Sequence, residues 1–342
     1  MNYGRTSLRR RAKQLDARGT RIRHKIGVIL GKLLLIGIIV GGCATVSFGV
    51  GAFKGILASA PDISEVDVIP TGYSTKVLAA DGSETAKLVA AGSNRQYVTI
   101  DQIPENLQHA VVAIEDERFY DHNGIDLKGI VRALVADVRT RDFSQGASTL
   151  TQQLIKNNVL SEQWANENDS NISKMEKMER QVQRKIQEQY LAIELEKKVN
   201  DKNWILENYL NAINLGQNTL GVGVASERYF GKDVSDLTLS ECAVLAAITQ
   251  SPSYYNPITH PDHNKERRQK VLNNMLDQGY ISQSEYDEAV ADNVYGRIQV
   301  VNVESQDENI NSYFVDEMTD QIVQDMIDRL GYTETQAYKA LY

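Results

Sequence analysis

The chain carries three carboxylates at the point where an apolar segment ends. The apolar residues 111–114 lead directly into Glu115, Asp116 and Glu117, so at least one carboxylate is expected at the edge of the core. Partial burial makes a carboxyl group a better general base near neutral pH. The alternative is a helix end at which surface acids meet solvent, and the spacing alone favours that alternative.

A second group of polar residues occupies positions 146–156. In a helix Thr149, Gln153 and Lys156 are spaced i, i+4 and i+7, so they form one polar stripe. Ser148 is a suitable N-cap for this helix, and Gly146 allows close approach in front of its N-terminus. This end of the helix could therefore hold an anion such as a phosphate. The alternative is an ordinary capped amphipathic helix, while the glycine and lysine spacing excludes a nucleotide P-loop.

A third group combines two cations with one acid on a single helix face. Arg184 and Glu188 are spaced i, i+4, and Lys185 and Glu188 are spaced i, i+3. The ordinary interpretation is a helix salt bridge worth a few tenths of a kcal/mol. The functional interpretation is that the cations keep the carboxylate ionised and grip a diphosphate.

These polar groups must be positioned by helices. Two short strands are expected within residues 74–89 around Asp81-Gly82, a common hairpin turn. Residues 161–179 form a polar insertion, and residues 216–231 form a glycine-rich turn region. The predicted fold class is therefore mainly α, with a short β-containing connector. Apolar periodicity predicts helices over residues 106–117, 127–138, 148–159, 178–198, 202–212, 235–249, 265–278, 282–292 and 311–342.

Residues 27–53 form an apolar segment that is long enough to cross a bilayer core of about 30 Å. Nine Lys and Arg against one acid give residues 1–26 a net charge of +8, and acids follow the segment. By the positive-inside rule, this predicts a single-pass anchor with a cytoplasmic N-terminus and an exported remainder. A cleaved signal peptide is the alternative, because Ala58-Ser59-Ala60 suits signal peptidase, although the apolar stretch exceeds the usual signal length. A buried core helix is disfavoured because the segment has no polar face.

The composition excludes several classes of protein. The 342 residues carry a formal net charge of −8 and are 42% hydrophobic, which argues against a disordered chain and a general nucleic-acid binder. Two cysteines, Cys43 and Cys242, are too few for a disulfide scaffold, and both lie in apolar segments. His260 and His263 are flanked by prolines without a nearby cysteine, so a loop without metal is expected there.

Taken in order, the polar groups resemble the motifs of peptidoglycan glycosyltransferases of glycosyltransferase family 51, which occur in class A penicillin-binding proteins and in monofunctional enzymes. The resemblance covers residues 104–292. Two further motifs, one around Tyr209 and one containing Pro252 and Arg267-Arg268, are expected to be mainly structural. The first three motifs correspond to Glu115, Asp116, Phe119, His122 and Gly124, then Gly146, Ser148, Thr149, Thr151, Gln152, Gln153 and Lys156, then Arg184, Lys185 and Glu188.

The resemblance implies a mainly α, lysozyme-like domain with a small membrane-proximal lobe. It implies polymerisation of lipid II into β-1,4 glycan, with inversion and release of undecaprenyl diphosphate. Glu115 would be the general base, and Glu188 would assist the donor diphosphate or bind a divalent cation (Mg or Mn), with no other cofactor implied. The residues implied for diphosphate binding are Lys156, Arg184, Lys185, Thr149 and Gln153, with support from Asp116, Phe119, His122, Ser148 and Gln152.

The resemblance also implies an organisation of the chain and a set of partners. Transpeptidase motifs of the Ser-x-x-Lys and Lys-Thr-Gly type are absent, and residues 311–342 resemble the connector that leads toward a transpeptidase domain. The chain is therefore expected to be the front part of a longer protein, by truncation or as a naturally shortened product, in which the transpeptidase domain is missing. Expected partners are lipid II, the growing glycan, the membrane and proteins of cell-wall assembly or division, with no nucleic acid. Residues 127–138 with Phe143 are expected either to form the lipid-side lobe or to pack in the core. The expected segments are a cytoplasmic tail (1–26), an anchor (27–53), a connector (54–103), the extracellular glycosyltransferase domain (104–295) and the start of a second connector (296–342).

Two rival functions stay open. A lytic enzyme of lysozyme-like fold would cleave the same glycan, but it needs an acid to protonate the sugar leaving group and has no need of a cationic cluster. A non-catalytic membrane scaffold of cell-wall assembly would need neither glutamate.

Overall fold

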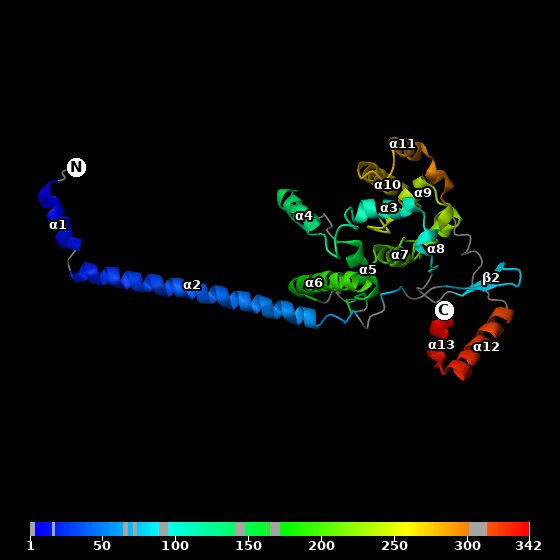
Figure 1. Cartoon of the computed structure of the whole chain (residues 1–342), viewed down its shortest axis with the longest axis horizontal. Coiled ribbons are helices and arrows are strands. Elements are labelled where there is room, and N and C mark those ends of the chain that lie inside the picture. Colours follow the sequence, from blue (N-terminus) through cyan, green and yellow to red (C-terminus); the bar gives the residue numbers. More distant parts are fainter. Residues whose placement is uncertain are drawn as a thin grey trace. The chain divides into compact units, whose positions relative to one another are not determined.

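The computed structural model is mainly helical and divides into two compact units, residues 1–60 and 61–342 (Figure 1). Each unit is considered by itself. The residues described are 4–15, 18–63, 68–70, 74–88, 95–140, 148–161, 163–164, 172–300 and 313–341.

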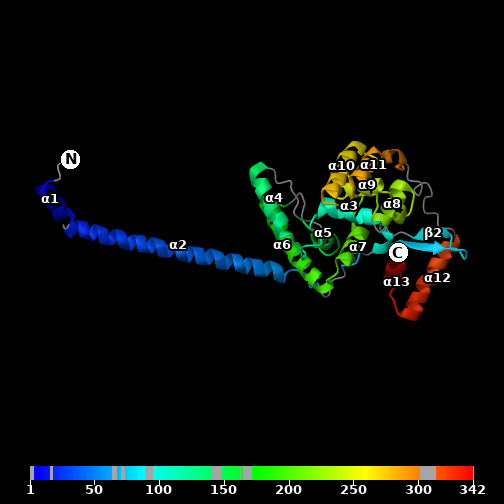
Figure 2. The same ribbon diagram turned by 45° about the horizontal axis from the view of Figure 1, so that its top comes forward.

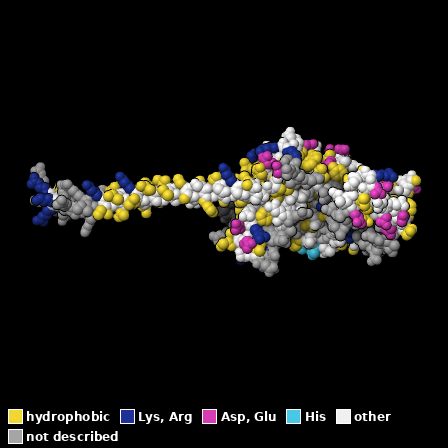
Figure 3. Space-filling view, turned by 90° about the horizontal axis from the view of Figure 1, so that it is seen from below, with side chains coloured by type: hydrophobic (Ala, Val, Ile, Leu, Met, Phe, Trp, Pro, Cys, Tyr) yellow, Lys and Arg dark blue, Asp and Glu magenta, His cyan; other side chains and the backbone are white. Residues whose placement is uncertain are grey.

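The first unit consists of two helices, α1 (Arg5–Leu15) and α2 (Arg18–Ala58). Within α2, the 34 residues Lys25–Ala58 are long and apolar enough on average to cross a membrane, and none of the tested window is buried inside the protein. Figure 3 shows hydrophobic side chains along this helix, with Lys and Arg gathered near the N-terminal end. The length and composition suit a single-pass anchor, as the sequence predicts for residues 27–53.

The core of the second unit is built around α9 (Leu239–Ile248), which is buried from its second residue to its end. α3 (Glu105–Glu115) and α10 (Pro261–Asp277) pack against it and against each other. Thr238 and Glu241 form a capping box that fixes where α9 begins. This packing holds the C-terminal end of α3, and with it Glu115, beside the end of α9.

A second helical group contains α5 (Leu150–Asn158), α6 (Lys174–Val199) and α7 (Lys202–Ala212), with α5 packed against both others. α6 ends at Asn200, which has a left-handed backbone (φ 50°), and the side chain of Asp201 then caps α7. The short link places α7 directly after α6 in the chain, and both helices pack against α5. α6 begins inside the stretch predicted to be a polar insertion, because Ser173 caps it.

The sequence predicts a glycine-rich turn region over residues 216–231, but the structure shows a helix within it. It contains α8 (Val222–Phe230), which begins after Gly221 and ends at Gly231. Both glycines have positive φ, 87° and 66°, so they terminate the helix rather than interrupt it. The unit also contains α4 (Leu127–Thr140) and α11 (Gln283–Ala291), with short 3₁₀ turns at Ile100–Gln102, Val234–Asp236 and Val294–Arg297.

A hairpin and two helices form a separate small core. Strands β1 (Thr75–Leu78) and β2 (Glu84–Leu88) pair antiparallel around the predicted Asp81-Gly82 turn, where Gly82 has a φ of 86°. α12 (Tyr313–Leu330) and α13 (Glu334–Leu341) lie beside β2 in both ribbon views (Figures 1 and 2). Segments from both predicted connectors therefore meet in one core. Its buried members are Leu88, Val315, Val323, Ala337 and Leu341.

Candidate active site

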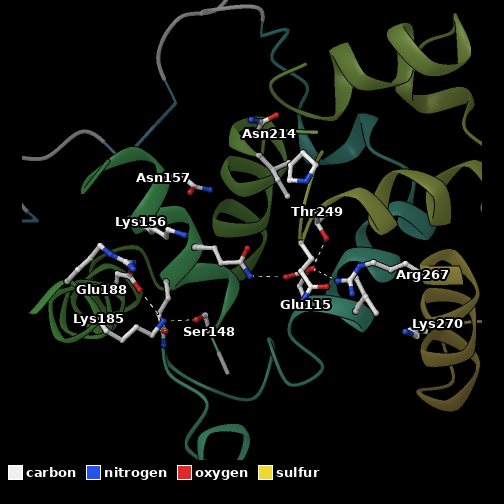
Figure 4. Close-up of a pocket in the computed structure, with 17 residues that line it drawn as sticks. Glu115, Ser148, Lys156, Asn157, Lys185, Glu188, Asn214, Thr249, Arg267 and Lys270 are labelled. Carbon is white, nitrogen blue, oxygen red and sulfur yellow. Dashed lines mark hydrogen bonds and ion pairs between the residues drawn. The ribbon is translucent and has the colours of Figure 1, made fainter. Parts of the chain in front are cut away.

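A cavity of about 920 Å³ opens between the helices that carry the predicted site residues. Figure 4 shows Glu115, Thr249, Arg267 and Lys270 on one side of it and Lys156, Lys185 and Glu188 on the other. The lining residues come from α3, α5, α6, α9's end and α10, so the cavity joins the two helical groups of the unit. The predicted site residues among them are Glu115, Ser148, Gln152, Gln153, Lys156, Arg184, Lys185 and Glu188.

Glu115 is the last residue of α3, and its side chain is 11% exposed in the cavity wall. Its Oε1 accepts hydrogen bonds from the hydroxyl of Thr249 (2.6 Å) and from Nη2 of Arg267 (3.1 Å). Its Oε2 accepts one from Nε2 of Gln153 (3.0 Å). The carboxylate is therefore held by three donors that come from three different elements, and it is not a surface acid in solvent.

Behind Gln153 lies a buried tyrosine. The hydroxyl of Tyr209 donates to Oε1 of Gln153 (3.1 Å), so Tyr209, Gln153 and Glu115 form one chain of hydrogen bonds. Burial, and secondarily the charge of Glu115, raise the pKa of Tyr209 well above its ordinary value. Tyr209 therefore stays a neutral donor that fixes the orientation of the Gln153 amide.

Glu188 is the centre of a cationic cluster on α6. Its side chain is 2% exposed, with Nη1 of Arg184 paired to Oε1 and Nζ of Lys185 3.0 Å from Oε2. Lys185 also donates to the hydroxyl of Ser148 (2.5 Å) and to Oε1 of Gln152 (3.1 Å). The carboxylate thus aligns two cations at the cavity wall, and Lys185 ties them to the start of α5.

Asp116 points away from the cavity, toward the N-terminus of α5. One of its oxygens accepts the backbone N–H of Leu150 (2.9 Å), and Nε2 of His122 lies 3.0 Å from both. A carboxylate at a helix N-terminus is favoured by the helix dipole and the unpaired N–H groups. Asp116 and His122 are therefore placed to position α5, on which Gln153 and Lys156 stand.

Thr149, not Ser148, caps α5. The Thr149 oxygen accepts the backbone N–H of Gln152 (3.2 Å), and its proton goes to the carbonyl oxygen of Gly124 (2.7 Å). Thr149 is consequently buried and does not line the cavity, so the predicted polar stripe of Thr149, Gln153 and Lys156 is reduced to its last two members. Ser148 is left free to meet Lys185 instead.

Other predicted residues lie behind the cavity or outside the described part of the chain. Phe119 is fully buried, and its ring meets the ring of His122 edge-on. The centre of the Phe119 ring lies 4.6 Å from Nζ of Lys202, so Phe119 packs beneath the site. Gly146 and Phe143 are outside the described residues.

Lys156 is exposed in the last turn of α5 and lines the cavity. Among the described residues it forms no ion pair or hydrogen bond, whereas Arg184 and Lys185 are both paired with Glu188. The Glu188 side of the cavity therefore holds a cation that is available to an anionic ligand.

The comparison with known families decides the classification. A family model described as Transglycosylase matches residues 81–276. The chain belongs to the transglycosylase family. The matched region is a peptidoglycan transglycosylase domain, an enzymatic glycosyltransferase related to the glycosyltransferase regions of class A penicillin-binding proteins.

Curated relatives of this transglycosylase are much longer proteins. Penicillin-binding protein 1F of Bacillus subtilis (strain 168) is 38% identical over 269 residues, covering 79% of this chain and 34% of that protein. Penicillin-binding protein 1A of Escherichia coli (strain K12) is 36% identical over 282 residues, covering 82% and 30%. A solved structure of penicillin-binding protein 1A from Haemophilus influenzae is 24% identical, covers 77% of this chain and 25% of that chain, and has a TM-score of 0.36. The chain spans about a third of the length of the curated relatives it matches.

The sequence did not reveal the partners of Glu115. The sequence pattern places Arg267 with Arg268 in a motif expected to be mainly structural, and it places Thr249 at the end of a predicted helix. Arg268 does have a structural place, because it is buried and donates to the hydroxyl of Ser240 (2.7 Å) and to the carbonyl of Ala289. Arg267, its neighbour on α10, faces Glu115 instead. Adjacent residues of a helix point in different directions, and this was the only sequence signal that the two arginines would have different contacts.

A divalent cation (Mg or Mn) beside Glu188 of the transglycosylase site stays a prediction. Both oxygens of Glu188 are paired with cations, and no group of three His, Cys, Asp or Glu that could hold a metal ion occurs among the described residues. Mg²⁺ is commonly held by one or two carboxylates together with substrate phosphates and water.

Proposed function

We propose that this transglycosylase polymerises lipid II into β-1,4 glycan strands, with inversion at the donor sugar and release of undecaprenyl diphosphate. The observation that carries the proposal is the division of the cavity, with a held carboxylate on one wall and a cationic cluster on the other (Figure 4). A transfer of this kind needs one base for the acceptor hydroxyl and positive charge for the leaving diphosphate.

Glu115 takes the role of general base in this proposal. Its carboxylate removes the proton from the acceptor sugar 4-hydroxyl while that oxygen forms a bond to the anomeric carbon of the donor. The bond from the anomeric carbon to the diphosphate breaks, and its electron pair leaves with the diphosphate. Attack opposite the leaving group inverts the anomeric carbon, so one carboxylate is sufficient.

The diphosphate is received by Lys156, Arg184 and Lys185. A departing dianion is stabilised by fixed cations, which need no proton transfer. Glu188 aligns Arg184 and Lys185, while Lys156 has no described partner to give up when the anion binds. A lytic enzyme would instead need a carboxylic acid in an apolar setting, and Glu188 lies between two cations.

The proposed reaction takes place at the membrane surface, because both substrates carry lipid tails that lie in the bilayer. α2 anchors the chain, with the basic N-terminal tail in the cytoplasm and the catalytic domain outside. Proteins of cell-wall assembly or division are its expected protein partners. No metal-dependent step is part of the proposal.

The decisive experiment incubates the full chain, purified in detergent, with fluorescent lipid II and resolves the products by gel electrophoresis. Long glycan is expected from the wild type, and Glu115→Gln is expected to lower the rate about 10²–10⁴-fold, the usual contribution of a general base. Glu105→Gln is the matched control, since Glu105 is an exposed acid at the other end of α3.

Two outcomes would contradict the proposal. A wild-type chain that makes no polymer but digests ready-made glycan is a lytic enzyme. A Glu115→Gln variant with wild-type polymerisation shows that Glu115 is not the base.

A further inference from the structure

The oxygens of Glu115 are used unequally. An ionised carboxylate has two oxygens with about four acceptor positions in all. Oε1 accepts from both Thr249 and Arg267, whereas Oε2 accepts only from Gln153. Oε1 is therefore saturated, and the one acceptor position left by the described donors belongs to Oε2.

Arg267 is held in place for this contact. Its side chain is 11% exposed on α10, and its guanidinium lies 5.0 Å from the centre of the Tyr255 ring, a cation–π arrangement. Among the described residues, its Nε is buried without a hydrogen-bond acceptor, and its Nη2 donates to Glu115. Burying an arginine against a single carboxylate carries a desolvation penalty, which an apolar residue in the same place would not carry.

Thr249 contributes the second donor to Oε1 from the C-terminal end of α9. Its hydroxyl lies 2.6 Å from Glu115 and 2.9 Å from the carbonyl oxygen of Ala246. A hydroxyl has one proton, and an ionised carboxylate is the stronger acceptor of the two. Figure 4 shows Thr249 and Arg267 meeting Glu115 from the side opposite Lys156, Lys185 and Glu188.

We propose that Arg267 and Thr249 are positioning residues that saturate Oε1 of Glu115, so that Oε2 is the atom that takes the acceptor proton. The inference rests on the proposed role of Glu115 as base. In the reaction the O–H bond of the acceptor breaks and an Oε2–H bond forms, which leaves Glu115 neutral. The charge of Arg267 is then no longer balanced by Glu115, at the moment when the diphosphate anion departs.

Arg267 is the charged group that faces Glu115 most closely. Its own helix also brings Lys270 to the cavity, and α5 and α7 bring the neutral Gln153 and Tyr209. Asp116, next in the chain, is turned toward His122 and the backbone of α5. Removal of Arg267 therefore removes the closest opposing charge and one hydrogen-bond donor from the Glu115 carboxylate, which disfavours its ionised form.

The test compares pH–rate profiles of lipid II polymerisation for Arg267→Gln, Arg267→Lys, Thr249→Val and Thr249→Ser. Arg267→Gln is expected to lower kcat about 10- to 100-fold and to move the acid limb to higher pH, with a smaller change in KM. Arg267→Lys keeps the charge, so its acid limb stays near that of the wild type. Thr249→Val is expected to lower kcat because the hydroxyl that donates to Glu115 is removed, whereas Thr249→Ser keeps the hydroxyl and is expected to keep kcat near that of the wild type.

Lys265→Gln is the matched control, because Lys265 is an exposed cation on the same helix that does not line the cavity. Its acid limb is expected to be unchanged. An Arg267→Gln variant whose kcat falls without any movement of the acid limb, or whose change is confined to KM, overturns the inference.

The failure of this inference is distinguishable from failure of the proposed function. If Glu115→Gln is inactive while Arg267→Gln and Thr249→Val have the wild-type profile, Glu115 is the base and only its positioning is wrong. If Glu115→Gln is active, the proposed function itself fails. Thermal unfolding of each variant separates a loss of folded protein from a loss of catalysis.

Discussion

Lys156 differs from Arg184 and Lys185 because it forms no ion pair or hydrogen bond within the described part of the chain. Arg184 and Lys185 are paired with Glu188, so their replacement would disturb both structure and ligand binding. Lys156 lines the same cavity from the exposed side of α5. A change at this residue therefore separates binding of the substrate anion from folding.

Lys156→Met is expected to lower polymerisation at least about 10-fold, because a leaving diphosphate loses a cation in a partly desolvated site. The free energy of unfolding is expected to stay within about 0.5 kcal/mol of the wild type. Lipid II assays and thermal unfolding on the same preparation measure both. Lys265→Met serves as the control, and a destabilised Lys156→Met protein would show that the side chain has a structural partner.

At the residue scale, the sequence could predict which side chains would be polar and close along one helix, but not which distant residues they would meet. Arg184, Lys185 and Glu188 share a helix face, so their pairing follows from helical spacing. Arg267 is separated from Glu115 by 152 positions, and their contact depends on the packing of α10 against α3. No local pattern encodes such a contact.

At the scale of elements, Gly124 links the motif that contains Glu115 and Asp116 to helices α5 and α6. Its φ is 87°, and its carbonyl oxygen accepts from Thr149 and Gln152 at the start of α5. A Cβ at this position would lie 2.6 Å from the backbone carbonyl carbon and oxygen of Ala192 on α6. The glycine therefore allows α5 and α6 to approach the Asp116 segment closely.

Gly124→Ala is expected to destabilise the protein by about 2–5 kcal/mol, from left-handed strain and from overpacking against α6. Gly82→Ala is the matched control, because Gly82 has the same φ region (86°) and nothing within 4 Å of its Cβ position. It should cost only the strain, about 1–2 kcal/mol. Urea unfolding of both variants checks the difference, and equal costs would mean that α6 yields without penalty.

The elements themselves were largely predictable where apolar periodicity and capping residues agree. The predicted helix 202–212 coincides with α7, which has Asp201 as its cap. The prediction failed at α8, because Gly221 and Gly231 were interpreted as turn residues although they are the ends of a helix. The start of α10 at Pro261 was also missed, since proline is tolerated in the first turn.

At the scale of the whole molecule, the sequence separated residues 54–103 and 296–342 as two connectors. Their described parts instead share a core, in which Leu88 of β2 packs with Val315 and Val323 of α12. Such a core joins a strand at the start of the matched transglycosylase region to helices that follow that region in the chain, so neither segment shows it alone. By contrast, the apolar helix near the N-terminus follows directly from composition, because a membrane span needs no tertiary partner.

The orientation of the chain in the membrane can be tested with its own cysteines as a background. Cys43 lies in the apolar part of α2, and Cys242 is fully buried in α9, where burial raises the pKa of its thiol. Neither thiol is expected to react with a membrane-impermeant maleimide. A single added cysteine at an exposed position therefore reports on which side it lies.

Lys265→Cys in the second unit and Lys13→Cys in α1 provide the two reporters, and both lysines are exposed. Because residues 1–26 carry a net charge of +8, the positive-inside rule places Lys13 in the cytoplasm and Lys265 outside. Intact protoplasts should label Lys265→Cys at once and Lys13→Cys only after permeabilisation. The reverse pattern would leave the catalytic domain on the cytoplasmic side, where glycan made by Glu115 could not join a cell wall, and it would contradict the proposed function as well as the orientation.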